Sequence, residues 1–289
     1  MDFRAILMGL AFSLMWSSAF ATARIIVADA PPLLALSARF AISGLIAVIA
    51  ARAMGQSWRL TRPVALSVII FGLCQNALYL GLNFIALQSV QASLASIIAS
   101  SMPLIVALLG WIWRGDKVGP LGILGLLAGF AGVALIMGGR VSGGADPVAV
   151  ALCVGGALAL AVATLTVRSV SSGGNLLMVV GLQMLVGSIT LGAVSAVLET
   201  PQVALTTPLM LAFAYQIAIP GLAATLLWFA LVGRVGAVRA STFHFLNPFF
   251  GVCVAAALLG EKIGLLDMIG VAIAAAGILA VQLSRMKAA

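Results

Sequence analysis

Ten long apolar segments, separated by short polar connections, account for most of this 289-residue chain. Each segment has about 20 residues or more, the length that an α-helix needs to cross the hydrocarbon core of a bilayer. The segments are continuously apolar, whereas membrane β-barrel strands alternate over about 10 residues. We therefore predict an all-α integral membrane protein with ten transmembrane helices. The predicted helices are 5–26, 32–53, 63–86, 91–113, 118–138, 147–167, 174–198, 208–232, 238–259 and 264–284.

The few charged residues are mostly basic and lie between the apolar segments. They make up 8% of the chain, against roughly 25% in a soluble domain. With the N-terminus in the cytoplasm, eleven basic residues lie on the inner side and three on the outer side, namely Arg24, Arg140 and Lys262. Because Lys and Arg favour cytoplasmic loops, both termini are predicted to be cytoplasmic. This charge pattern suits anionic lipid headgroups, and we expect no nucleic acid partner.

Sequence features recur at a spacing of 145 residues, which indicates an internal repeat. Each half then holds five helices, and because five is odd the two halves are inverted relative to each other. We assign residues 1–140 to the first five-helix repeat and 141–289 to the second, within one membrane domain. Inverted repeats are typical of transporters that alternate access to a site at the repeat interface; chance similarity between Gly- and Ala-rich helices is the alternative. The recurring pairs are Pro103 and Pro248, Asp116 and Glu261, Lys117 and Lys262, Gly125 and Gly270, and Gly132 and Gly277.

The N-terminal segment also has some features of a cleaved signal peptide. It has a charged start, an apolar stretch and small residues at Ala19, Ala21 and Ala23. However, Trp16 and several serines interrupt the apolar stretch, and removal of the segment would break the repeat. We therefore favour a first transmembrane helix.

Two kinds of motif carry a resemblance to a known family. Gly-Asp-Lys at 115–117 and Gly-Glu-Lys at 260–262 follow the fourth and ninth helices, and FSLMWSSAF and PLLALSARF lie in the first two. On these residues the whole chain resembles the drug/metabolite transporter superfamily, in particular its EamA-type bacterial exporters, and most of all the aromatic amino acid exporters. The resemblance implies a monomeric, multi-pass carrier of the bacterial inner membrane with a central cavity.

Polar stripes on four predicted helices indicate which residues face that cavity. Polar groups inside a membrane usually face the protein interior or water, and helical spacing groups them on the first, third, fourth and ninth helices. The alternatives are a core histidine, interhelical hydrogen bonds from the amides, and aromatic side chains in the core or facing lipid. The candidate substrate-binding or cavity residues are Trp16, Ser17, Gln75, Asn76, Tyr79, Asn83, Ser100, Pro103, Trp228, Phe243, His244, Asn247 and Pro248.

The two repeat-related prolines are expected to interrupt helical hydrogen bonding. Pro248 would leave the carbonyl of His244 without its helical partner, and Pro103 would do the same for Ala99. Such a group survives in a membrane only where protein or cavity water satisfies it. It would then accept a hydrogen bond from a substrate ammonium, and the kink would aid rocking; a kink used only for packing is the alternative.

Charged side chains supply five further candidates, which we assign to structural or gating roles: Arg39, Asp116, Lys117, Glu261 and Lys262. Arg39 is the only charge well inside a predicted helix, about 10 Å from its outer end at 1.5 Å per residue. It either snorkels to the surface or anchors a polar network or a carboxylate.

The residues that are missing from the predicted helices restrict the chemistry. All seven acidic residues lie at termini, in loops or at helix ends, so that only His244 could serve as a proton relay in the membrane. Facilitated transport is therefore expected. Because few basic residues lie deep in the predicted helices, phosphate-rich substrates are disfavoured. Because no acidic residue lies deep there, dications are disfavoured as well. One histidine and three separate cysteines cannot build a metal site, and no catalytic residue or cofactor is predicted.

These expectations together describe a transporter rather than an enzyme, because no nucleophile–base pair is present in the sequence. The expected substrate is a small, zwitterionic, partly apolar molecule. We expect export of amino acids, in particular the aromatic ones (Phe, Tyr, Trp), through a central cavity by alternating access. The alternative is a broad-specificity efflux carrier for drugs or other small metabolites.

Overall fold

The computed structural model describes residues 2–116, 118–167 and 174–288, and contains ten helical spans long and apolar enough to cross a membrane. All ten predicted helices are therefore confirmed, with ends within three residues of those expected. Several spans are divided into shorter elements. The elements are α1 (Phe3–Asp29), α2 (Pro32–Ala53), α3 (Arg62–Phe71), η1 (Gly72–Tyr79), α4 (Leu80–Ala86), α5 (Ala92–Ser100), α6 (Met102–Arg114), α7 (Pro120–Ser142), α8 (Pro147–Val167), α9 (Leu176–Leu198), α10 (Thr207–Gln216), η2 (Ile217–Ala223), α11 (Ala224–Val235), α12 (Ala237–Ser241), η3 (Thr242–Leu246), α13 (Asn247–Leu259) and α14 (Leu265–Ala288).

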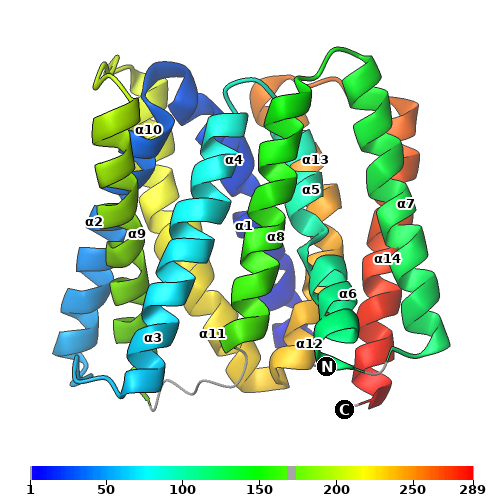
Figure 1. Ribbon diagram of the computed structural model, residues 1–289, viewed down its shortest axis with the longest axis horizontal. Coiled ribbons are helices and arrows are strands. Elements are labelled where there is room, and N and C mark those ends of the chain that lie inside the picture. The colour runs from blue at the N-terminus through cyan, green and yellow to red at the C-terminus, as the bar shows by residue number, and fades with distance from the viewer. Residues whose placement is uncertain (1, 117, 168–173, 289) are drawn as a thin grey trace.

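The spans run alternately up and down, so that the two halves of the chain are inverted. The start of α1 and the end of α14 lie at the same end of the bundle, which we call the termini face (Figure 1). After five spans, α8 begins the second half at the other end, which we call the opposite face. The predicted inverted five-helix repeats are thereby confirmed. That the termini face is cytoplasmic remains a prediction, as does the boundary at residues 140 and 141.

Helices from the two halves pack directly against each other. α2 packs along α9, and α7 lies beside α14 (Figure 1). At the second contact, a Cβ added to Gly125 would lie 2.8 Å from the carbonyl oxygen of Gly277, and one added to Gly132 would lie 2.7 Å from that of Gly270. Repeat-related glycines thus allow two backbones to approach closely, as small residues do in membrane helix pairs.

The third span of each half contains a π-helical segment, a feature not anticipated from the sequence. η1 and η2 begin at Gly72 and Ile217, 145 residues apart, which is the repeat spacing. π-Helical turns inside α-helices are rare and are often found at functional sites. η1 carries Gln75, Asn76 and Tyr79, three of the candidate cavity residues.

The fourth span of each half is broken close to its proline, but in a way that corrects our expectation. The broken span has no free carbonyl at His244, because the short 3₁₀ segment η3 lets Asn247 N–H donate to it. Pro248 then lies in the first turn of α13, where a missing N–H costs nothing. Likewise α5 ends at Ser100, and Pro103 lies in the first turn of α6. The prolines therefore begin new helices instead of kinking continuous ones.

Candidate functional site

A cavity of about 590 Å³ lies between the two halves. Trp16 and Gln75, near the middle of their spans, form its inner part, whereas Val64, Thr164 and Leu176 come from helix ends at the termini face. This main chamber therefore extends from the middle of the bundle toward the termini face.

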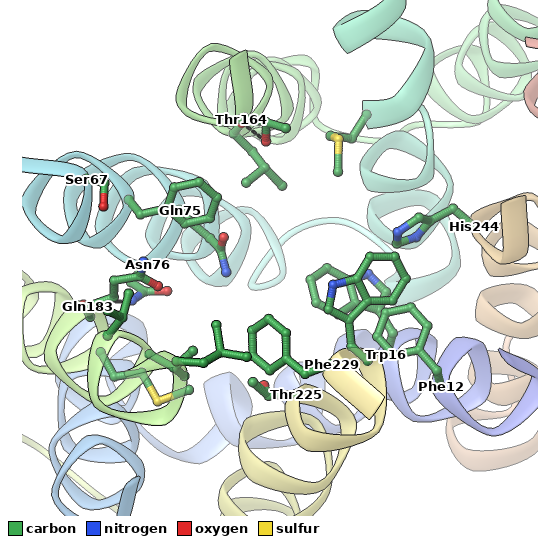
Figure 2. A pocket seen from close by; sticks show the side chains of 18 of the residues that line it. Phe12, Trp16, Ser67, Gln75, Asn76, Thr164, Gln183, Thr225, Phe229 and His244 are labelled. Atoms are coloured by element: carbon green, nitrogen blue, oxygen red, sulfur yellow. Dashed lines mark hydrogen bonds between the residues drawn. The ribbon is translucent and has the colours of Figure 1, made fainter. Parts of the chain in front are cut away.

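One wall of the main chamber is aromatic. The ring centroids of Phe12 and Trp228 are 4.7 Å apart, those of Trp228 and His244 are 5.3 Å apart, and those of Trp16 and His244 are 6.4 Å apart. Phe229 also lines the chamber (Figure 2). Rings at such distances, in tilted and edge-on arrangements, form a surface that suits another flat ring.

The facing wall is polar and carries amides from both halves. Gln75 and Asn76 of η1 and Gln183 of α9 lie across the chamber from the aromatic wall (Figure 2). Asn76 Nδ2 donates to the carbonyl oxygen of Gln183 at 2.8 Å, which fixes its amide. Thr225 of α11 adds a hydroxyl. A ligand in this chamber thus meets rings on one side and hydrogen-bonding groups on the other.

The imidazole of His244 is held by a polar contact within its own span. Asn247 Nδ2 lies 3.0 Å from His244 Nδ1, within hydrogen-bonding distance. Asn247 thus positions the imidazole in the chamber wall without lining the chamber itself.

A second chamber of about 70 Å³ lies beyond the main one. The two chambers share Trp16, Gln75, Asn76, Met184 and Thr225. The second chamber is lined further by residues closer to the opposite face. These are Ala19, Phe20, Ala23, Arg39, Phe40, Tyr79, Leu80, Asn83, Phe84, Leu87, Gln216 and Pro220. The second chamber therefore lies between the main chamber and the opposite face.

Most of the candidate cavity residues lie in a chamber wall. Trp16, Gln75, Asn76, Trp228 and His244 line the main chamber, and Tyr79 and Asn83 line the second.

The remaining candidates are placed in neither chamber wall. Ser17 Oγ donates to the carbonyl oxygen of Asn247 at 3.2 Å, Ser100 Oγ donates to that of Ser96 at 2.6 Å, and Phe243 is buried against Gly9. Pro103 and Pro248 begin helices, as described above. These residues hold α1, α5 and the broken ninth span in place.

Polar contacts join the two halves at the opposite face. Glu261 accepts from the backbone N–H groups of Ala92 and Ser93 at 2.7 and 3.1 Å, at the start of α5. Glu199 accepts from Leu33 and Leu34 N–H, both at 2.9 Å, in the first turn of α2. Carboxylates at helix N-termini meet both unpaired N–H groups and the positive end of the helix dipole. We call these two carboxylate–helix contacts the opposite-face latches.

An ion pair also joins the two halves at the opposite face. Arg140 at the end of α7 pairs with Asp267 of α14, with 2.7 Å between Nη2 and Oδ2. Arg140 also donates to the carbonyl oxygen of Lys262 at 3.5 Å. Of the other gating candidates, Asp116 lies at the termini face, where its N–H donates to Gly110 at 3.1 Å, and Lys117 lies outside the described residues.

Sequence reasoning missed several wall residues. Thr164, Gln183 and Thr225 interrupt apolar runs in the sixth, seventh and eighth spans, so that a search for polar stripes on those helices would have found them. Phe12 and Phe229 are apolar residues within apolar runs, and no local signal separates them from lipid-facing residues.

Inverted halves with a chamber between them are typical of membrane transporters. The EamA-like transporter family matches residues 3–138 and 147–283, one match in each half, and the chain belongs to this family. This confirms the coarser resemblance inferred from the sequence motifs.

The relatives extend over nearly the whole chain. An uncharacterized transporter of Bacillus subtilis, YvbV, is 29% identical over 261 residues, covering 87% of this chain and 83% of its own length. An uncharacterized transporter of Synechocystis, sll0355, is 25% identical, covering 89% and 83%. The chloroplastic WAT1-related protein At3g02690 of Arabidopsis thaliana is 25% identical, covering 89% and 64%.

A solved crystal structure superposes on 100% of this chain and of its own, with a TM-score of 0.71. At 22% sequence identity this likeness shows the fold alone. Membership of the family establishes membrane transport.

Proposed function

We propose that this protein exports amino acids, chiefly phenylalanine, tyrosine and tryptophan, from the bacterial cytoplasm by alternating access through the main chamber. The observation that carries the proposal is the aromatic wall of Phe12, Trp16, Trp228 and His244 facing the amides of η1 and α9. An aromatic amino acid has both a flat ring and a polar end, which suits these two walls.

The size of the main chamber supports this proposal. Sites for small molecules typically measure roughly 300–1,000 Å³, and the chamber holds about 590 Å³. This is room for one amino acid with some water. The chamber lining reaches helix ends at the termini face, and the opposite-face latches join the two halves at the other end, so that solute would be loaded from the termini face.

The same walls support facilitated transport. No aspartate or glutamate is found among the residues that line the two chambers. A proton-coupled carrier would need an intramembrane titratable group, and His244 is the single candidate here. Substrate would therefore move down its own gradient, carried by a monomer in the inner membrane.

Broad efflux of drugs or other small metabolites is the second candidate function. It is favoured by the share of large apolar side chains in the main chamber, including Phe71, Met102, Leu160 and Phe229. Such a surface accepts many apolar shapes. A selective carrier and a broad one differ in whether glycine, toxic aromatic analogues and unrelated dyes compete for the same site.

Counterflow with purified protein in liposomes tests the proposal. Liposomes loaded with unlabelled phenylalanine, without a pH difference, should accumulate labelled phenylalanine and tryptophan transiently, and excess glycine should not compete. Competition by unrelated cationic dyes would favour the efflux carrier, and uptake only with an imposed pH step would contradict facilitated transport.

A further inference from the structure

Arg39 carries a buried charge that no described residue neutralises. Its side chain on α2 is 5% exposed, so it does not snorkel to the surface. Its Nε has no hydrogen-bond partner, and none of the hydrogen bonds and ion pairs described involves its guanidinium. The guanidinium lies over the adjacent Phe40 ring, with Cζ 5.2 Å from the centroid. Burying an unpaired charge is costly, and a ligand anion would offset that cost.

Arg39 lines the second chamber together with Asn83 and Gln216, two residues whose buried amide oxygens also lack partners. Gln216 is fully buried, and its Nε2 donates to the carbonyl oxygen of Ala19 at 2.6 Å and to Thr22 Oγ1 at 2.9 Å, so its amide is fixed and Oε1 is left unpaired. Asn83 Nδ2 donates to the carbonyl oxygen of Tyr79 at 2.7 Å, which leaves its Oδ1 unpaired. The lining of one small chamber therefore combines a buried arginine with two fixed amides, each of which has an unpaired oxygen.

We propose that the second chamber binds the charged end of the transported molecule, with its carboxylate on Arg39 and its ammonium group on the amide oxygens of Asn83 and Gln216. The proposal rests on the function proposed above and extends it to the atoms that recognise an α-amino acid. Guanidinium groups bind carboxylates through paired, charge-assisted hydrogen bonds, and carbonyl-type oxygens accept from ammonium groups.

The dimensions of the two chambers agree with this division of the ligand. A volume of about 70 Å³ is less than half of the roughly 150 Å³ cavity that accommodates benzene, and is too small for an aromatic ring. The ring would remain in the main chamber against Trp16 and Trp228, and the polar end would pass the shared residues Gln75, Asn76 and Thr225. The site therefore selects molecules that join an apolar body to a carboxylate.

Binding of two matched ligands to purified protein in nanodiscs tests the carboxylate half. 3-Phenylpropanoate and 3-phenylpropanamide share a ring and a chain, and differ in charge. Calorimetry should show that the wild-type protein binds the carboxylate about tenfold or more tightly, as expected for a hydrogen bond to a charged group. In Arg39→Gln this ratio should fall to about one through weaker binding of the carboxylate alone, and Arg39→Lys should retain part of it. An unchanged ratio in Arg39→Gln, or no preference in the wild type, overturns the proposal.

A second pair of variants tests the ammonium half and does not depend on the folding of Arg39→Gln. Asn83→Leu and Gln216→Met should each weaken phenylalanine several-fold and leave 3-phenylpropanoate nearly unchanged. Equal weakening of both ligands would assign these residues to packing and overturn this half.

The outcome separates the subsite from the proposed function. If amino acid counterflow fails while the carboxylate preference depends on Arg39, the proposed substrate is wrong and the subsite stands. If counterflow succeeds while the preference survives in Arg39→Gln, export stands and the subsite is overturned.

Discussion

At the scale of single residues, the main chamber is assembled from side chains far apart in the sequence. Phe12 and Trp16 come from the first span, Trp228 from the eighth and His244 from the ninth. The rings touch only because α1 packs against both α11 and η3. An aromatic substrate would gain stacking energy from this group, roughly 0.5–1.5 kcal/mol per ring pair beyond burial.

Trp228→Ala should weaken phenylalanine transport by about tenfold, because it removes one ring of the wall and widens the chamber. Initial counterflow rates at several substrate concentrations measure the effect. The matched control is Phe249→Ala, which removes an aromatic side chain that is 52% exposed on the outside of α13 and should leave transport unchanged. Equal effects of the two substitutions would place the wall outside the route of the substrate.

Asp2 provides a pH-dependent contact at the termini face. Arg234, which donates to its carboxylate at 3.0 Å, holds the pKa of Asp2 down to about 2. The depressed pKa means that the contact stabilises the fold at neutral pH and is lost as the pH falls through about 2. Asp2→Asn keeps a side chain that caps α1 and removes the charge. Its melting temperature in detergent should lie below the wild-type value at pH 7 and approach it at pH 2. An equal difference in melting temperature at both pH values would show that the ion pair has no role in stability.

At the scale of elements, length and hydropathy predict the ten spans because the bilayer imposes them. The breaks in the fourth and ninth spans were foreseen from Pro103 and Pro248, but their form was not, since whether a proline kinks a helix or begins a new one depends on the backbone around it. Of the two π-helical segments, η2 contains Pro220, which signals an interruption of helical hydrogen bonding. η1 contains no proline, so that no such signal marks it in the sequence.

The opposite-face latches are the elements most directly open to test. Glu199→Gln and Glu261→Gln keep the size of the side chain and weaken its hydrogen bonds to the start of α2 or α5. Each should favour opening of the opposite face by about 1.5–3 kcal/mol, the contribution of a hydrogen bond to a charged group. Spin labels at Gln88 and Gln202, exposed on opposite halves, should then show longer distances. The control Arg59→Gln, at the termini face, should leave these distances unchanged. Unchanged distances in both latch variants would contradict the role of Glu199 and Glu261 in holding the opposite face together.

At the scale of the whole molecule, the prediction concerns which face of the bundle lies in the cytoplasm. The excess of basic residues at the termini face favours a cytoplasmic location for it. In intact cells, with Cys253→Ala as background because that thiol is exposed, a membrane-impermeant maleimide should label Gln202→Cys and not Arg59→Cys. The reverse labelling would show that the chamber described here opens outward.

The symmetry of the halves gives the latch at Glu261 a counterpart. Asp116 is the repeat partner of Glu261, and Ala237, the first residue of α12, is the repeat partner of Ala92. If the halves exchange shapes when the carrier turns over, Asp116 should meet the backbone N–H groups at the start of α12 and shut the termini face. The two acids would then stabilise the two alternative conformations of the carrier. Asp116→Asn should favour the conformation described here, whereas Glu261→Gln should favour the one in which the termini face is shut.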